Sequence, residues 1–327
     1  MTTQYTKALI VVHREESADD FREIAIRIKK LDPAICGAMA PGYISEEMLP
    51  PHFLALPLLV VYLVNPPASN ADQGVIRNAT HIAVESINKI EEYEHFKKHN
   101  IPCLPIIRFQ WGMELDQEIY GDWVVLKPEN IQSTGQDVNM VPTKLIPTLK
   151  LSDFPKDHLM HRDSYLVQKL VKTGENPNTY RATVFMGAIL SSGFARMVYP
   201  YPVESSELST LLSTTVATNF LSQRTRHFVK DLEANDLALK VAEAFPNNPL
   251  LAIDILRDGD TNKLYVLETN LGGNTWHFSS ALSRNYPGYD DETRKATLLQ
   301  YGAWDRASDA LVGKANELLC KDRRIND

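Results

Sequence analysis

The sequence has few cysteines and no long apolar run, and both features exclude broad classes of protein. Its three cysteines, Cys36, Cys103 and Cys320, are far apart, which excludes a disulfide framework and the paired ligand spacing of a zinc site. The longest apolar run, residues 53–64, is interrupted by Pro57 and is much shorter than a membrane-spanning helix. We therefore expect free thiols in a cytoplasmic protein with no membrane partner.

A general basic surface is also absent. The formal net charge is −7 at pH 7, from 34 Lys and Arg against 41 Asp and Glu. A chain with this charge does not neutralise a nucleic-acid backbone, and its short basic clusters, such as Lys97-Lys98, are typical of solvated helix faces. We therefore exclude nucleic acid as a partner.

The order of the apolar segments predicts an α/β protein with several subdomains. A chain of 327 residues is longer than a single hydrophobic core supports, since such cores stop growing near about 250 residues. A strand at residues 8–12, an amphipathic helix ending near Leu31 and a buried strand at 56–64 indicate the start of a parallel sheet. Ser17 is predicted to cap the helix, with Asp20 completing a near capping box.

Later segments favour antiparallel strands and terminal helices. A new lobe is predicted to start at Tyr165 with a meander of residues 165–171, 180–190 and 193–199. Asp236 is predicted to cap the next helix. Residues 250–256 and 263–267 flank a turn-forming segment, 257–260, and so predict a hairpin.

Polar residues in this hairpin indicate a metal site. Asp254 lies within an otherwise apolar strand, where an unpaired carboxylate would be costly. Glu268 and Asn270 end the next strand and share one of its faces. Carboxylate and amide oxygens suit Mg²⁺, whose coordination phosphates and water can complete. The alternative is that a neighbouring arginine satisfies Asp254 and that Glu268 and Asn270 begin a loop.

A lysine closes the strand at residues 122–127 just before a loop of small polar residues. Lys127 is followed by Pro128 and by Ser133-Thr134-Gly135. Such a lysine can meet a polyphosphate where backbone N–H groups also point at it. In the alternative, Lys127 is an exposed lysine at the end of a strand.

Four motifs, taken in order, resemble those of the ATP-grasp superfamily over about residues 82–280. They are Asn88-Lys89 before a helix, residues 124–128 with Ser133-Thr134-Gly135, residues 166–171, and Asp254 with Glu268-Thr269-Asn270. The resemblance implies an α/β (α+β) ATP-grasp fold behind a parallel α/β pre-ATP-grasp domain. The implied parts are residues 1–84, then 85–164 with the phosphate loop, and 165–327 with the metal site and terminal helices.

The resemblance also implies a nucleotide site and a metal site. The ATP-binding set would be Lys89, Lys127, Ser133, Thr134, Gly135 and the hinge Gln168, Lys169, Leu170 and Val171. Relatives often hold the ribose with an acid that is missing here, and Glu175 is the candidate replacement. Asp254, Glu268 and Asn270 would hold Mg²⁺, with Mn²⁺ as an alternative.

Catalytic and substrate residues follow from the same resemblance. Arg181 and Lys127 are the catalytic candidates, since both could stabilise developing charge. Arg224 and Arg226 could clamp an anionic substrate through bidentate contacts. Gly273, Asn274 and Trp276 are expected to line the substrate site; in the alternative, Trp276 only packs, and Arg181 is a surface arginine. His277 is a general-base candidate on position alone.

The implied activity is that of an ATP-dependent carboxylate–amine ligase. ATP would phosphorylate a small-molecule or peptide-like carboxylate, and an amine would then attack the acylphosphate. Two alternatives stay open: a small-molecule kinase on the same fold, and a nucleotide-binding regulator without turnover. The sequence identifies neither the acid nor the acceptor, and a homodimer is one assembly it leaves open.

Overall fold

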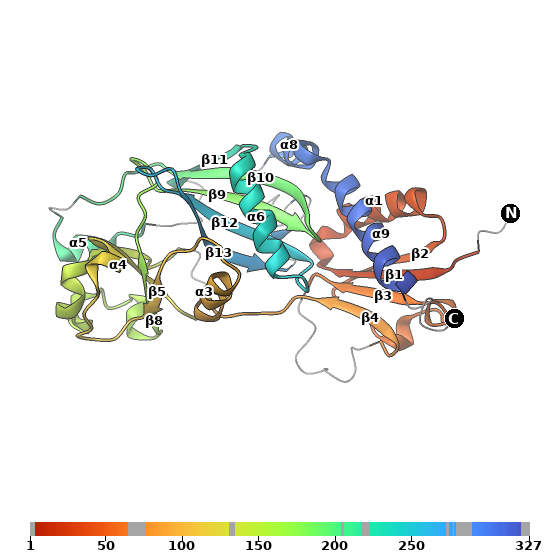
Figure 1. Cartoon of the computed structure of the whole chain (residues 1–327), viewed down its shortest axis with the longest axis horizontal. Helices are drawn as coiled ribbons and strands as arrows, with labels where there is room; N and C mark the ends of the chain where they lie inside the picture. The colour runs from red at the N-terminus through yellow and green to blue at the C-terminus, as the bar shows by residue number, and fades with distance from the viewer. Residues whose placement is uncertain are drawn as a thin grey trace.

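The residues that the computed structural model describes form three β-sheets (Figure 1). The structure describes residues 4–64, 76–130, 135–203, 206–216, 223–272, 275–276, 278 and 290–321. The five-stranded sheet lies in the middle of an elongated molecule, with a four-stranded sheet toward each end. A parallel sheet followed by antiparallel sheets confirms the predicted α/β (α+β) class.

The first sheet is parallel, in the order β2-β1-β3-β4. Its strands are β1 (Lys7–His13), β2 (Ile35–Pro41), β3 (Leu58–Tyr62) and β4 (Ala79–Ala83). All five residues of β3 are buried, as a continuous apolar run predicts for a strand covered on both faces. Helix α1 (Ala18–Leu31) packs against the C-terminal helix α9 (Ala303–Lys321) beside this sheet (Figure 1).

Asp20 does not complete the capping box expected at the start of α1. Ser17 is the N-cap, but its side chain makes no capping hydrogen bond. Asp20 is fully buried and accepts hydrogen bonds from Trp276 Nε1 at 2.9 Å and Trp304 Nε1 at 2.8 Å. Its carboxylate therefore joins α1 to α9 and to the segment that follows the last strand.

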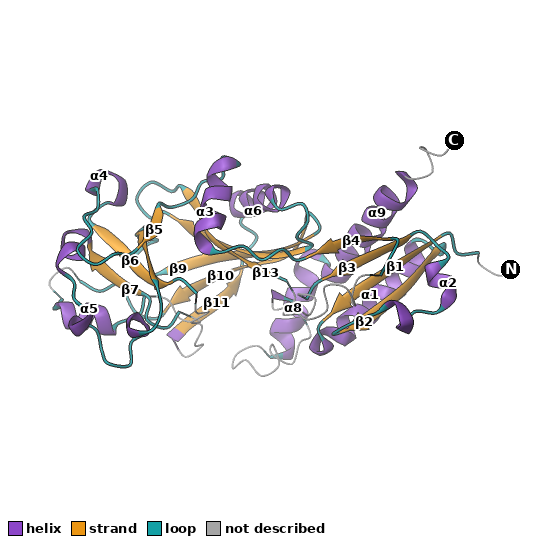
Figure 2. Cartoon of the chain, turned by 90° about the horizontal axis from the view of Figure 1, so that it is seen from below, coloured by secondary structure: helices purple, strands orange, loops and turns teal. Residues whose placement is uncertain are grey.

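The middle sheet is antiparallel and has one apolar and one polar face. Its order is β11-β10-β9-β12-β13, with β9 (Asn178–Phe185), β10 (Ala188–Met197), β11 (Arg224–Phe228), β12 (Leu250–Arg257) and β13 (Leu264–Leu271). Alternate residues such as Ala182, Ile253 and Val266 form a core with α6 (Leu232–Ala244) and α3 (Lys89–Lys98), which lie on the same side of the sheet (Figure 2). The hairpin of β12 and β13 is confirmed.

The third sheet has the order β5-β8-β6-β7 and takes in a strand that was expected elsewhere. Its strands are β5 (Ile106–Arg108), β6 (Trp123–Pro128), β7 (Asn139–Pro142) and β8 (Tyr165–Lys169). Because β8 pairs with β5 and β6, it is not the first strand of the predicted meander. The division at residue 165 stays a proposal, but β8 belongs to the sheet that precedes it.

The other α-helices of the described residues connect the strands. They are α2 (Pro51–Leu54), α4 (Gln117–Tyr120), α5 (Leu208–Ser213) and α8 (Asp291–Tyr301). Helix α6 begins at Leu232, earlier than predicted, because Asp231 accepts a hydrogen bond from the Ala234 backbone N–H and is the cap in place of Asp236. In the described part of the chain, every helix is too short or too polar to cross a membrane.

We expect Gly272→Ala to destabilise the fold more than Gly187→Ala. Both glycines have a φ of +81°, but a Cβ on Gly272 would lie 3.0 Å from the Leu63 carbonyl oxygen, whereas one on Gly187 would meet no described atom within 4 Å. The loss of unfolding free energy should be about 1 kcal/mol for Gly187→Ala and about 2–4 kcal/mol for Gly272→Ala. Urea unfolding measures both, and equal losses would contradict a close approach at Gly272.

Candidate functional site

A row of charged residues crosses the polar face of the middle sheet. Strand pairing places Arg181 of β9 beside Asp254 of β12, and Asp254 beside Glu268 of β13. Asn270 pairs with Ala252, two residues along, so its side chain is on the same face as that of Glu268. The structure therefore brings together the three residues predicted to hold a metal.

Asp254 forms a two-pronged ion pair with Arg181. Nε and Nη2 of Arg181 donate to Oδ1 and Oδ2 of Asp254, each at 2.6 Å, and Asn270 Nδ2 donates to Oδ2 at 3.1 Å. The Asp254 side chain is only 8% exposed, so these bonds offset the cost of burying its charge. A neighbouring arginine thus satisfies Asp254, as the alternative interpretation of the sequence held.

The donor set around Asp254 is nevertheless of the kind that Mg²⁺ binds. Asp254, Glu268 and Asn270 all line one cavity and offer the hard oxygen atoms that Mg²⁺ prefers. Arg181 already donates to both Asp254 oxygens, so an ion bound at Asp254 would share this carboxylate with the guanidinium. Across the described residues, no cluster of three or more His, Cys, Asp or Glu side chains is placed to hold an ion; this set relies on an asparagine as its third member.

Lys127 reaches the same cavity from β6. Its side chain is buried, and this burial lowers its pKa, with Lys89 acting in the same direction and Glu268 in the opposite one. An anion that entered the cavity would favour the charged form of Lys127. The lysine is therefore not the exposed strand end of the alternative interpretation.

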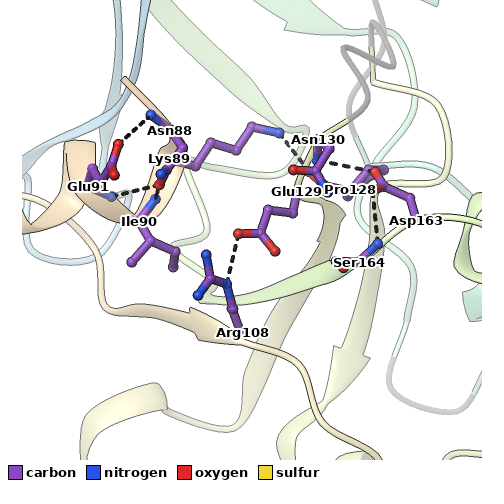
Figure 3. Close-up of polar contacts among 10 residues, drawn as sticks. All are labelled: Asn88, Lys89, Ile90, Glu91, Arg108, Pro128, Glu129, Asn130, Asp163 and Ser164. Atoms are coloured by element: carbon purple, nitrogen blue, oxygen red, sulfur yellow. Dashed lines mark hydrogen bonds and ion pairs between the residues drawn. The ribbon is translucent and has the colours of Figure 1, made fainter. Parts of the chain in front are cut away.

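Lys89 approaches from the first turn of α3. The helix begins here because the Asn88 side chain accepts hydrogen bonds from the backbone N–H groups of Ile90 and Glu91, and the Glu91 carboxylate accepts one from the Asn88 backbone N–H. The Lys89 side chain extends away from the helix, and its Nζ donates to the Pro128 carbonyl oxygen at 2.6 Å (Figure 3). This bond places Lys89 next to the end of the Lys127 strand.

The chain just beyond Pro128 is held by ionic and polar contacts (Figure 3). Arg108 Nε donates to Glu129 Oε1 at 2.9 Å, and Asn130 Nδ2 donates to Asp163 Oδ1 at 2.9 Å. Both contacts fix the entry to the predicted phosphate loop.

The predicted phosphate loop is described only at its C-terminal end. Gly135 has a φ of +94° and lines the cavity, and its carbonyl oxygen accepts a hydrogen bond from Thr215 Oγ1. Ser133 and Thr134 lie outside the described residues. Of the three predicted loop residues, the structure therefore places Gly135 alone at the cavity.

A cavity of about 1000 Å³ joins these residues. It lies between β6 and β8 of the third sheet and the polar face of the middle sheet. Its described lining includes the predicted site residues Lys89, Lys127, Gly135, Gln168, Lys169, Leu170, Val171, Arg181, Arg224, Arg226, Asp254, Glu268 and Asn270. This volume is at the upper end of ordinary ligand sites and leaves room for a nucleotide with a second ligand.

Two predicted site residues lie away from this cavity. The Glu175 side chain is 83% exposed, with Arg196 Nη2 4.0 Å from its Oε2. Trp276 is 1% exposed and packs against Phe21 and Phe185. It was expected to line the substrate site, and the structure corrects this: its indole N–H donates to the buried carboxylate of Asp20, which holds the ring in the core. Gly273, Asn274 and His277 lie outside the described residues.

Glu92 is a buried acid at the cavity that the sequence analysis missed. Only 6% of Glu92 is exposed, and its carboxylate accepts hydrogen bonds from the backbone N–H of Thr269, at 2.8 Å, and from Thr269 Oγ1. Burial raises the pKa of this carboxyl to about 7, with the nearby Glu268 charge adding to the shift and the Thr269 bonds opposing it. Helical spacing offered a signal, since Glu92 shares the buried face of α3 with Phe96.

Comparison with known proteins finds solved structures that are similar to this one. No protein-family model matches the sequence, and no curated protein matches it. Among solved structures, an ATP-bound D-alanine–D-alanine ligase from Bacillus anthracis matches with a TM-score of 0.50 at 12% identity, over 98% of this chain and 100% of that one. A second structure of that ligase gives 0.51 at 13%, over 97% and 100%. The ATP-grasp ligase PsnB, with its precursor peptide and AMPPNP, gives 0.50 at 12%, over 96% and 100%.

The chain has the ATP-grasp fold. The likeness extends over nearly the whole length of both chains, and at 12–13% identity it concerns the arrangement of the elements. The chemistry of the cavity between the two antiparallel sheets therefore depends on the residues of this chain that line it.

We expect stability to fall as pH rises through the range in which Glu92 ionises. Its pKa is about 7 in the folded chain against an ordinary 4.5, so folding favours the protonated form, and that stabilisation is present below about pH 4.5 and lost as pH rises toward about 7. Between about pH 5 and pH 8 the wild type should lose about 2–3 kcal/mol relative to Glu92→Gln. Urea unfolding of both proteins measures this difference, and a pH-independent difference would contradict it.

Proposed function

We propose that this ATP-grasp chain is an ATP- and Mg²⁺-dependent ligase that joins a carboxylate to an amine. One observation carries the proposal: two lysines from separate elements and the row Arg181, Asp254, Glu268 meet at a single cavity. Positive charge for a polyphosphate and oxygen donors for a cation thus lie together, as phosphoryl transfer requires.

The nucleotide would lie between the third sheet and the middle sheet. Lys89 and the buried Lys127 would face its phosphates, where the loss of solvent strengthens each charge interaction. Residues 168–171 line the same cavity and would offer backbone groups to the base. Two of the similar structures hold a nucleotide, ATP in the D-alanine–D-alanine ligase and AMPPNP in PsnB.

Asp254, Glu268 and Asn270 would hold the Mg²⁺ ion, which when bound would neutralise charge on the phosphates. Arg181 is held beside Asp254 by two short hydrogen bonds. Its guanidinium is thereby fixed on the cavity face before any substrate arrives. A donor held in this way can stabilise developing charge without reorganising, and this is the role we assign to Arg181.

The strand β11 would take the anionic substrate. Arg224 and Arg226 are alternate residues of β11 and both line the cavity, as does Phe228. The acids among the described lining residues are Glu92, Glu129, Asp254 and Glu268. All four belong to the nucleotide and metal parts, so the β11 wall is positive, and guanidinium groups match a carboxylate through paired hydrogen bonds.

The proposed reaction needs no covalent enzyme nucleophile. A carboxylate oxygen of the acid substrate would attack the terminal phosphorus of ATP, and ADP would leave. The amine nitrogen would then attack the acyl carbon of the acylphosphate, lose a proton and displace phosphate. The side chains described above would position the reactants and offset their charge.

Phosphate release should need ATP, Mg²⁺, an acid and an amine together. Incubation with pools of carboxylates and amines, followed by assay of free phosphate, tests this requirement. Glu268→Ala should lower the rate at least about 100-fold, whereas Glu243→Ala, at an exposed site on α6, should not change it. Phosphate found on a single substrate would favour the kinase, and unchanged turnover in Glu268→Ala would refute the metal assignment.

Arg226→Ala should weaken binding of the acid substrate identified by that screen. The hydrogen bonds of a charged pair would be lost, so the KM for the acid should rise roughly 10–100-fold while the KM for ATP stays unchanged. Arg196→Ala is the matched control, since this exposed arginine of β10 does not line the cavity. An equal effect of the two substitutions would contradict a substrate contact at Arg226.

A further inference from the structure

The strand that carries Glu268 and Asn270 has little backbone support on its outer side. β13 is the last strand of the middle sheet, and among the described residues its outer partner is a single bridge between Val266 and Cys103. The register with β12 also shifts beside Asp254, so that Asp254 pairs with Glu268 but Ile255 pairs with Val266. An edge strand with a bulge is locally free to bend and twist.

Glu92 supplies the missing support at one point on this edge. Thr269 stands between Glu268 and Asn270 and, by alternation, points to the other face, where it pairs with the buried Ile253. The Glu92 carboxylate accepts from the backbone N–H of Thr269 at 2.8 Å and from its hydroxyl. The carboxylate thus takes the place of a neighbouring strand for the residue between the two oxygen donors.

The same acid connects this strand to Lys89. Glu92 lies one turn along α3 from Lys89, in a helix whose start is fixed by the Asn88 cap. Burial of Glu92 leaves little freedom for its side chain. A displacement of α3 would therefore be transmitted to β13, so Lys89 would move together with Glu268 and Asn270.

We propose that Glu92 is a positioning residue that fixes β13 at Thr269 and so holds Glu268 and Asn270 in place for a divalent cation. This inference rests on the proposed Mg²⁺ site. Supporting residues of this kind commonly change metal affinity by about 10–100-fold when removed. Lys89 and Lys127 are placed by the Asn88 cap and by β6, but Glu92 also lines the cavity, so the quantity that reports on the cation is the ratio of nucleotide affinities with and without Mg²⁺.

The test compares AMPPNP binding by the full chain with and without Mg²⁺, using isothermal titration calorimetry. Glu92→Ala should lose about 10–100-fold of the affinity gained on adding Mg²⁺, and an effect of Glu92 on nucleotide binding alone cancels in this ratio. Glu92→Gln should retain that gain, because an amide oxygen can accept both bonds from Thr269. Binding of Mn²⁺, followed by electron paramagnetic resonance, should show the same order of variants.

The partner residue gives an independent arm. Thr269→Val removes the hydroxyl bond and should lose roughly 10-fold of the Mg²⁺-dependent gain, whereas Thr269→Ser should retain it. If Glu92→Ala does not fold, the comparison of Thr269→Val with Thr269→Ser still tests whether the contact between Glu92 and Thr269 supports cation binding. Equal Mg²⁺-dependent gains in all variants, or equal losses in Glu92→Ala and Glu92→Gln, overturn the positioning role. A wild-type chain that binds no AMPPNP overturns the proposed function itself.

Discussion

The carboxylate of Asp254 is the constraint on which the site depends. It lies in β12, an interior strand of the middle sheet, with apolar neighbours on either side in the sequence, and an unpaired charge there would be very costly. Arg181 meets it from one neighbouring strand and Asn270 from the other. Because those partners must share its face, the same face also carries Glu268, and the opposite face is left apolar for α3 and α6 to cover.

The division of the middle sheet into a polar and an apolar face explains which parts of the site could be predicted from the sequence. The apolar segments 250–256 and 263–267 around a turn-forming segment predict the hairpin. Alternation gives the shared face of Glu268 and Asn270, since side-chain direction in a strand is a local property. Lys127 could be predicted because its place at the end of a strand is also a local property. The partner of Asp254 was not, because Arg181 is 73 residues away in sequence and only strand order brings it near.

Non-local pairing also accounts for the features that the sequence misplaced. β8 is followed closely by β9, yet β8 joins β5 and β6 in another sheet, and adjacency in sequence carried no information about that choice. Ser17 and Asp20 fit the local spacing of a capping box. In the structure, however, the Asp20 carboxylate accepts hydrogen bonds from the indole N–H groups of Trp276 and Trp304 instead. Tertiary partners of this kind cannot be read from spacing alone.

The support of β13 shows why naming site residues is easier than explaining their geometry. Besides β12, its contacts come from separate elements: the Pro102 carbonyl accepts from Val266 N–H, Glu92 accepts from Thr269, and Gly272 approaches the Leu63 carbonyl oxygen. None of these groups belongs to a strand that continues the sheet, and each is fixed by a different packing unit. Besides pairing with β12, the directions of Glu268 and Asn270 thus depend on contacts from α3, from the segment before β5 and from the end of β3. The position of these two candidate metal ligands therefore depends on how separate parts of the chain pack together.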